Sequence, residues 1–211
     1  MVHQTSRTDR HSRDRVIHWA WVYDIGTGLL GRRGRRMRDR FADDLQLTPG
    51  DHVLDVGCGP GRLTTVFAQR VAPSGSVDGI DPSPEMISRA AARARKHGVQ
   101  ASFQVAYAQQ LPFADDAFDA VACTLALHHV AENDRRTAVA EMYRVLKPGG
   151  RLLIAEFQGK GHGHPGPRWL RRTGGEDMIK IALDLITAAG FAGIASGPTN
   201  LGWLGKITAR K

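Results

Sequence analysis

The sequence contains only two cysteines and no long apolar run. Two cysteines supply neither a disulfide framework nor a four-ligand metal site, and because Cys58 and Cys123 lie in apolar, strand-like segments we expect two free thiols. No stretch approaches the roughly 20 apolar residues of a membrane-spanning helix, and the N-terminus lacks the apolar core of a signal peptide. These absences predict a cytoplasmic protein without a transmembrane segment.

Positive charge is in excess and is concentrated at the N-terminus. The formal net charge is +8, and residues 1–40 hold ten arginines against four aspartates, so six of the excess charges lie there. Such a balance is typical of proteins that meet nucleic acid or anionic headgroups. The Arg-rich stretch 32–47 fits either a solvated helix face or a phosphate or membrane contact.

We expect three regions along the chain. Residues 1–15 are polar and aperiodic, which predicts a disordered basic tail. Residues 16–47 predict a basic, helical lid segment, whose Trp19, Trp21 and Tyr23 either pack on the core or cover an apolar acceptor. Residues 48–211 predict a single domain, because a chain of 211 residues is short for two.

Strand and helix patterns alternate through this domain. Strands are predicted at 53–56, 76–80, 101–106, 117–124, 150–157, 194–196 and 204–209, and helices at 62–70, 84–97, 133–146 and 176–189. This order predicts an α/β fold: a doubly wound, mostly parallel seven-stranded sheet with helices on both faces. Ligands of such sheets bind at the carboxyl ends of the strands.

A glycine-rich turn follows the first predicted strand. Gly57, Gly59 and Gly61 are spaced G-x-G-x-G, where the dinucleotide-binding turn has G-x-G-x-x-G. Asp55 precedes the turn and suits a cationic ligand better than a pyrophosphate. Asp81 closes the second strand, where a carboxylate can accept hydrogen bonds from both hydroxyls of a ribose. A Rossmann-like fold that binds some other nucleotide is the alternative.

Four motifs resemble those of class I S-adenosylmethionine-dependent methyltransferases, especially the ubiquinone/menaquinone-biosynthesis and related small-molecule branch. They are VLDVGCGPG (53–61), GIDPSPEMI (79–87), LPFADDAFDAVACTLALHHV (111–130) and RVLKPGGRLLIAEF (144–157). The resemblance implies S-adenosylmethionine as cofactor and S-adenosylhomocysteine as product. It implies that the cofactor is bound by Asp55, Gly57, Cys58, Gly59, Gly61, Asp81, Pro82, Met86, Ala108 and Leu125, with Tyr23 closing over it.

The chain departs from the family pattern after the third strand. Such enzymes carry an acid there that accepts a hydrogen bond from the adenine amino group, whereas this chain has Tyr107. The phenol of Tyr107 or the amide of Gln109 can accept that bond, and the Ala108 NH can reach the ring. We expect weakened or reshaped adenine binding.

Methyl transfer from a sulfonium needs alignment, and a base only where the acceptor must lose a proton. His128 and His129 follow the fourth strand and are either bases or structural residues; His18 and Glu156 are the other candidates. The Gly- and His-rich loop 158–167 lacks further metal ligands, so we expect a substrate loop and no metal.

Three functions remain open at this point. The first is methylation of a small, apolar or lipid-like acceptor. The second is methylation of RNA, with the basic N-terminus binding phosphates. The third is a cofactor-binding protein that transfers no methyl group, or that uses the sulfonium charge to catalyse a rearrangement or cyclisation. The resemblance also suggests a homodimer.

Overall fold

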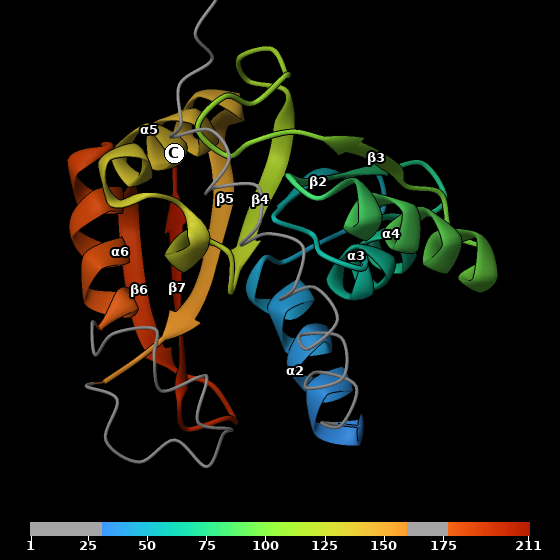
Figure 1. Ribbon diagram of the computed structural model, residues 1–211, viewed down its shortest axis with the longest axis horizontal. Helices are drawn as coiled ribbons and strands as arrows, with labels where there is room; N and C mark the ends of the chain where they lie inside the picture. Colours follow the sequence, from blue (N-terminus) through green and yellow to red (C-terminus); the bar gives the residue numbers. More distant parts are fainter. Residues whose placement is uncertain (1–30, 160–176) are drawn as a thin grey trace, which may run out of the picture.

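The computed structural model describes residues 31–159 and 177–211, which form a seven-stranded sheet flanked by helices (Figure 1). The strands are β1 (His52–Val56), β2 (Ser76–Asp81), β3 (Ser102–Val105), β4 (Phe118–Thr124), β5 (Leu146–Phe157), β6 (Ala192–Pro198) and β7 (Leu204–Arg210). The helices are α2 (Gly31–Asp44), α3 (Arg62–Val71), α4 (Pro84–His97), the short 3₁₀ helix η1 (Leu127–His129), α5 (Glu132–Val145) and α6 (Met178–Ala188).

The strand order is β3-β2-β1-β4-β5-β7-β6. Strands β1 to β5 pair in parallel, while β7 is antiparallel to both β5 and β6. This confirms the predicted doubly wound, mostly parallel seven-stranded sheet. The order reverses between β1 and β4, and the carboxyl ends of adjacent parallel strands at such a reversal form a ligand-binding crevice.

Helices cover both faces of the sheet, so its inner strands are buried on both sides. One core contains Val121 and Ile154 with residues of α5 and α6. The other contains Ala122 and Leu153 with residues of α2 and α3. Neighbouring residues of β4 and β5 thus enter opposite cores, as the two-residue period of a strand requires.

The ends of α4 follow from local sequence. Ser83 accepts a hydrogen bond from the Met86 NH and caps the helix, and Pro84 occupies its first turn. Gly98 ends the helix in the left-handed conformation, with its NH directed to the carbonyls of Ala94 and Arg95. The predicted bounds of this helix are confirmed.

The start of β5 differs from the prediction. The strand begins at Leu146 rather than Gly150, because Phe118 of β4 pairs with Leu146 before the register shifts. The Pro148-Gly149-Gly150 sequence has the composition of a turn, and only the neighbouring strand shows that the backbone before it is already extended.

The N-terminal part of the prediction is visible only in part. Of the lid segment 16–47, the structure describes residues 31–47, where α2 buries Phe41 and leads to the buried Leu45, as expected. The tail 1–15, Trp19, Trp21 and Tyr23 lie outside the described residues. None of the helices in residues 31–159 and 177–211 has the length and apolarity that a membrane crossing requires.

Candidate functional site

The glycine turn between β1 and α3 contains three residues with positive φ: Gly57 (70°), Gly59 (52°) and Gly61 (73°). A Cβ at Gly57 would lie 2.3 Å from the Ala126 Cβ, and one at Gly61 would lie 2.9 Å from the Ala90 Cβ. These two glycines are therefore required for packing. At Gly59 no atom lies within 4 Å of the corresponding position, so its backbone borders open space.

Asp55, in β1, is the buried acid beside this turn. Its side chain is 1% exposed, and its Oδ2 accepts a 2.6 Å hydrogen bond from the Thr64 hydroxyl of α3. Burial raises the pKa of Asp55 to about 6, and the neighbouring Asp81 charge adds to the rise while the Thr64 bond opposes it. Sequence reasoning missed Thr64; a hydroxyl on the buried face of α3 was the available signal.

Asp81, at the end of β2, joins the turn to α4. Its Oδ2 accepts a hydrogen bond from the Gly59 NH (3.0 Å), and its Oδ1 accepts one from the Ser83 NH (2.9 Å). Burial raises the pKa of Asp81, and these two bonds oppose the rise. An ionised carboxylate has about four lone-pair positions, so two acceptor positions remain for a ligand.

The residues predicted around an adenine ring lie on the neighbouring segments. Met86 is buried at the start of α4, and Pro82 is half-buried before it. The Tyr107–Gln110 turn is closed by a hydrogen bond from the Gln110 NH to the Tyr107 carbonyl, and the Ala106 NH donates to the Asp81 carbonyl. Tyr107 is 57% exposed, so the ring that replaces the family acid faces solvent.

Both cysteines are buried and free, as predicted. Cys58 lies in the glycine turn, where its NH donates to the Ile80 carbonyl and links the turn to β2. Burial raises the pKa of the Cys58 thiol far above its ordinary range, and burial raises that of Cys123 in β4 as well. Both side chains therefore stay protonated and act as packing groups.

The segment after β4 carries a strained residue and two histidines. Leu125 has φ +51°, an unfavourable value for a branched side chain, and its NH donates to the Ala155 carbonyl. His129 lies against His128, with ring centroids 4.0 Å apart. Loss of hydration among the packed groups and the adjacent His128 both lower the pKa of His129, although part of its surface remains exposed.

Glu156, near the end of β5, is the hydrogen-bond partner of His128. The carboxylate is completely buried and accepts hydrogen bonds from His128 Nδ1 (2.9 Å) and from the His128 NH (3.3 Å). A carboxylate partner assigns the proton of the neutral ring to Nδ1 and leaves the lone pair on Nε2. His128 and Glu156, two of the candidate bases from the sequence, thus form one hydrogen-bonded pair.

These groups lie at or just after the carboxyl ends of β3, β2, β1, β4 and β5, which are adjacent in the sheet. Within residues 31–159 and 177–211, no group of three or more His, Cys, Asp or Glu side chains can hold a metal ion. Most of the loop 158–167, with both its histidines, lies outside those ranges, as do His18 and Tyr23.

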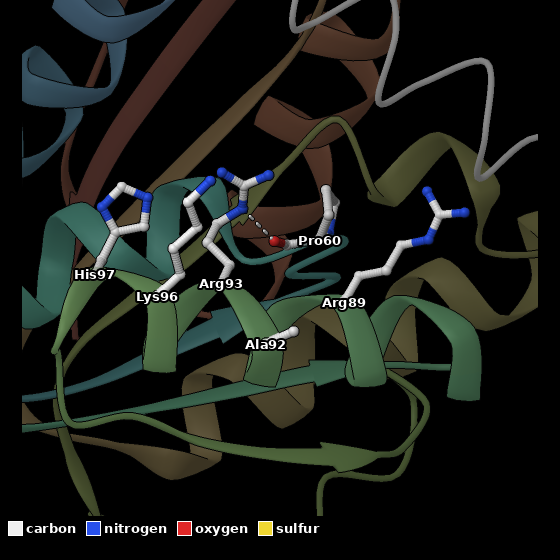
Figure 2. A pocket seen from close by; sticks show the side chains of 6 residues that line it. All are labelled: Pro60, Arg89, Ala92, Arg93, Lys96 and His97. Atoms are coloured by element: carbon white, nitrogen blue, oxygen red, sulfur yellow. Dashed lines mark hydrogen bonds between the residues drawn. The ribbon is translucent and has the colours of Figure 1, made fainter.

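A shallow hollow of about 400 Å³ lies elsewhere, along the outer side of α4 (Figure 2). Its lining contains Arg89, Arg93, Lys96 and His97 of α4, and Arg93 Nε donates to the Pro60 carbonyl of the glycine turn. Apart from Pro60, which lies within the glycine turn, its lining contains no residue of the predicted cofactor site. The Arg93 bond thus ties Pro60 of the turn to α4, whereas the neighbouring Gly59 is bound by Asp81.

Residues 53–150 match a family model described as a methyltransferase domain. The chain is 42% identical over 118 residues to the demethylmenaquinone methyltransferase of Symbiobacterium thermophilum, covering 55% of this chain and 46% of that protein. It is 38% identical over 138 residues to a ubiquinone/menaquinone biosynthesis C-methyltransferase of Vibrio campbellii, covering 64% and 52%. This chain thus spans about half the length of these relatives.

Two solved structures extend the likeness over more of the chain. The 4+2 cyclase SpnF has a TM-score of 0.71 at 26% identity, over 84% of this chain and 80% of that one. A SAM-dependent methyltransferase from Aquifex aeolicus has a TM-score of 0.72 at 20% identity, over 88% and 97%, which shows the shared fold.

Proposed function

Because this chain belongs to the class I S-adenosylmethionine-dependent methyltransferases and is similar to their ubiquinone/menaquinone-biosynthesis branch, we propose that it methylates a small, lipid-like acceptor. The observation that carries the proposal is the Asp81 carboxylate. It is fixed by the Gly59 and Ser83 amides beside the one glycine of the turn that faces open space.

The residues of this edge fit S-adenosylmethionine. The backbone around Gly59 leaves room for a ligand, and Asp81 retains acceptor positions for ribose hydroxyls. Asp55 adds negative charge beside the space, which suits a cationic amino group. When bound, the cofactor supplies an electrophilic methyl group on a sulfonium.

Each part of the cofactor has its own set of residues in this proposal. Asp55, Leu125 and the turn Gly57–Gly61, with Cys58, hold the methionine part, and Asp81 holds the ribose. The adenine is bounded by Pro82 and Met86 on one side and by Tyr107, Ala108 and Gln109 on the other. Tyr23 keeps its predicted place as the closing residue. Met86, which is 5% exposed, is the apolar residue of this set that is held in the core.

His128 is the group we assign to proton transfer. Glu156 holds Nδ1–H, which leaves the lone pair of the neutral ring on Nε2, the ring nitrogen away from the carboxylate. With the cofactor bound, His128 Nε2 would accept the proton that the acceptor releases on methylation. His129 packs against this ring at an interplanar angle of 44°, and its lowered pKa, about 4, keeps it neutral at pH 7.

The acceptor class follows from the names of the relatives and from apolar surroundings. Demethylmenaquinone is the compound named for the Symbiobacterium enzyme, and the His128 ring contacts Phe157, which in turn lies beside Trp203. We therefore propose a reduced quinone ring as the methyl acceptor. A homodimer and a cytoplasmic location remain predictions from the sequence.

The cofactor assignment can be tested without an acceptor. Calorimetric titration with S-adenosylmethionine and S-adenosylhomocysteine should show saturable binding that weakens about 10- to 100-fold in Asp81→Ala, because a charge-assisted hydrogen bond contributes about 1.5–3 kcal/mol. The control Asp184→Ala removes an exposed carboxylate of α6 and should bind normally. Tyr107→Asp should bind as well as or better than the wild type. Absence of binding by the wild type would overturn the proposal.

The likeness to SpnF supports a second candidate, in which the bound cofactor assists a cyclisation and no methyl group is transferred. The two candidates differ in the mass of the product. Incubation with S-adenosylmethionine and a reduced naphthoquinone bearing a short isoprenoid chain should yield a product heavier by one CH₂ group together with S-adenosylhomocysteine. A product of unchanged mass with intact cofactor would favour the cyclase.

A further inference from the structure

The first ten residues of α2 carry an unusual amount of charge. Residues 31–40 contain six arginines and one aspartate, a net charge of +5. The exposed members of this set are Arg32, Arg33, Arg35, Arg36 and Arg40, which we call the basic face of α2. None of the five forms an ion pair with another residue in the described ranges.

This arrangement of charges destabilises the helix that contains it. The N-terminal end of a helix carries partial positive charge, so cations there are unfavourable. Arg32 and Arg36, and again Arg36 and Arg40, are four residues apart, where like charges repel. A sequence that breaks local rules without compensation inside the fold points to a partner outside it.

Two of the three acids of α2 do not offset this charge, because they are engaged in the last turn; the third, Asp39, is already counted in the net charge of +5. Asp43 pairs with Arg70 of α3, and Asp44 pairs with Lys206 of β7. These pairs and the buried Phe41 fix the C-terminal half of the helix to the domain. The basic face is therefore held on an element that is fixed to the domain, with its charge concentrated toward the N-terminal end of that helix.

The cations of α4 differ from this set. Arg89 pairs with Glu85. Arg93 donates to the Pro60 carbonyl (Figure 2), so both arginines have structural partners. These two side chains have partners within the domain. The arginines of the basic face form no such ion pairs with the residues that the structure describes.

The position of α2 relates the basic face to the functional edge. Figure 1 shows the N-terminal half of α2 projecting from the domain on the side toward which β5 points. That is the side of the carboxyl ends, where Asp55, Asp81 and His128 lie. A surface that contacts the basic face would therefore lie on the same side of the molecule as the candidate site.

We propose that the basic face of α2 binds the anionic surface of a lipid bilayer and holds the site toward the layer from which a lipid-like acceptor comes. The choice of a lipid partner rests on the proposed function. The face has five guanidinium groups for lipid phosphates and no exposed large apolar side chain, so binding is electrostatic adsorption without insertion. It also has no aromatic side chain on which bases could stack, which makes single-stranded RNA a poorer fit.

The test is cosedimentation of the full chain with vesicles. Binding to phosphatidylcholine vesicles that contain about one third phosphatidylglycerol should be strong at 50 mM salt and fall at least tenfold by 300 mM, since salt screens exposed charges. Pure phosphatidylcholine vesicles should bind little. A variant with Arg32, Arg33, Arg35 and Arg36 each replaced by Gln should lose at least tenfold in vesicle binding. Its thermal midpoint should not fall, since the changes relieve repulsion.

A matched control removes the same number of cations elsewhere. Arg95, Lys96, Arg136 and Lys180, each replaced by Gln, lie on α4, α5 and α6, and this variant should keep vesicle binding close to that of the wild type. Equal losses in both variants, or no binding to anionic vesicles at 50 mM salt, would overturn the proposal. Tight salt-dependent binding of RNA without vesicle binding would do so in favour of nucleic acid. Calorimetry of cofactor binding on the same preparations separates these outcomes from failure of the proposed function.

Discussion

At the scale of single residues, the site depends on carboxylates whose surroundings oppose their charge. Asp55 is buried in β1 with one hydroxyl partner, and its pKa is raised to about 6. In the protein without cofactor, the protonated form is therefore favoured up to that pH. A cationic group of the cofactor beside Asp55 would reverse this preference, so binding would release a proton.

Cofactor affinity should consequently depend on pH in a defined direction. Because the ionised form of Asp55 binds the cation, affinity should fall by up to tenfold for each pH unit below 6 and level off above about pH 7. Asp55→Asn should bind more weakly at pH 7.5 and lose most of this dependence. Calorimetry at pH 5, 6, 7 and 8 measures it. An affinity that rises toward pH 5 would contradict the assignment.

Stability of the free protein should depend on pH in the opposite direction. The folded pKa of Asp55 lies above its ordinary value of 3.8, so this residue favours folding at acid pH and loses that contribution as pH rises from about 4 through 6. The contribution is at most about 3 kcal/mol, from about 1.4 kcal/mol per unit. In denaturant titrations between pH 5 and 8, Asp55→Asn should lose less stability than the wild type.

The His128–Glu156 pair allows a sharper test of proton transfer. In Glu156→Gln the tautomer of His128 is no longer fixed, so turnover at pH 7 should fall about 10- to 100-fold. Cofactor affinity should be unchanged. The defect should shrink at higher pH, where the quinol loses its own proton to water. A merely structural role predicts a loss that is independent of pH, and His129→Asn serves as the neighbouring control.

The sequence predicted the residues of the candidate site better than it predicted their hydrogen-bond partners. Asp55, Asp81, His128 and Glu156 stand out because each is a polar residue near or just after the end of a buried strand. The bonds that give them their properties join segments far apart in the chain, such as His128 with Glu156. No local pattern encodes those pairings, because they arise only when the sheet places β4 beside β5.

At the scale of elements, the glycine turn separates packing from binding. Gly57 lies against Ala126, and Gly59 borders open space, although both have positive φ. The spacing of the glycines predicted the turn and its role in approaching a ligand. It could not distinguish these two positions, because the contact with Ala126 comes from the segment after β4.

Substitution of the two glycines by alanine should therefore have different effects. Gly57→Ala places a Cβ 2.3 Å from another Cβ and should destabilise the domain by more than about 2 kcal/mol, as overpacking and strained backbone combine. Gly59→Ala should cost only about 1 kcal/mol of left-handed strain and yet weaken cofactor binding at least tenfold. Chemical denaturation and calorimetry measure the two effects. Equal destabilisation with normal binding in Gly59→Ala would contradict the assignment.

The boundaries of elements followed the sequence where local signals were strong. Both bounds of α4 were predicted because Ser83, Pro84 and Gly98 are cap residues. The start of β5 was not, because Pro148-Gly149-Gly150 has turn composition and only pairing with β4 extends the strand back to Leu146. Tertiary pairing overrides local propensity at such positions.

At the scale of the whole molecule, the sheet brings together groups that the chain separates. Residues 55, 81, 128 and 156 span about half of the sequence, yet all lie at or after the carboxyl ends of strands that are adjacent in the order β2-β1-β4-β5. A ligand across this edge contacts several elements at once. It should therefore stabilise the folded domain as a unit, since the unfolded chain has no such edge.

Saturating S-adenosylhomocysteine should raise the thermal midpoint of the full chain. At 100 times the dissociation constant, binding to the folded state alone adds about 2.7 kcal/mol, which for a domain of this size corresponds to about 5–10 °C. Asp81→Ala should show a much smaller shift at the same ligand concentration, and Asp184→Ala should show the full one. A shift of equal size in Asp81→Ala and the wild type would place the ligand elsewhere. The α4 hollow, whose basic lining could bind its carboxylate, would then be the next site to test.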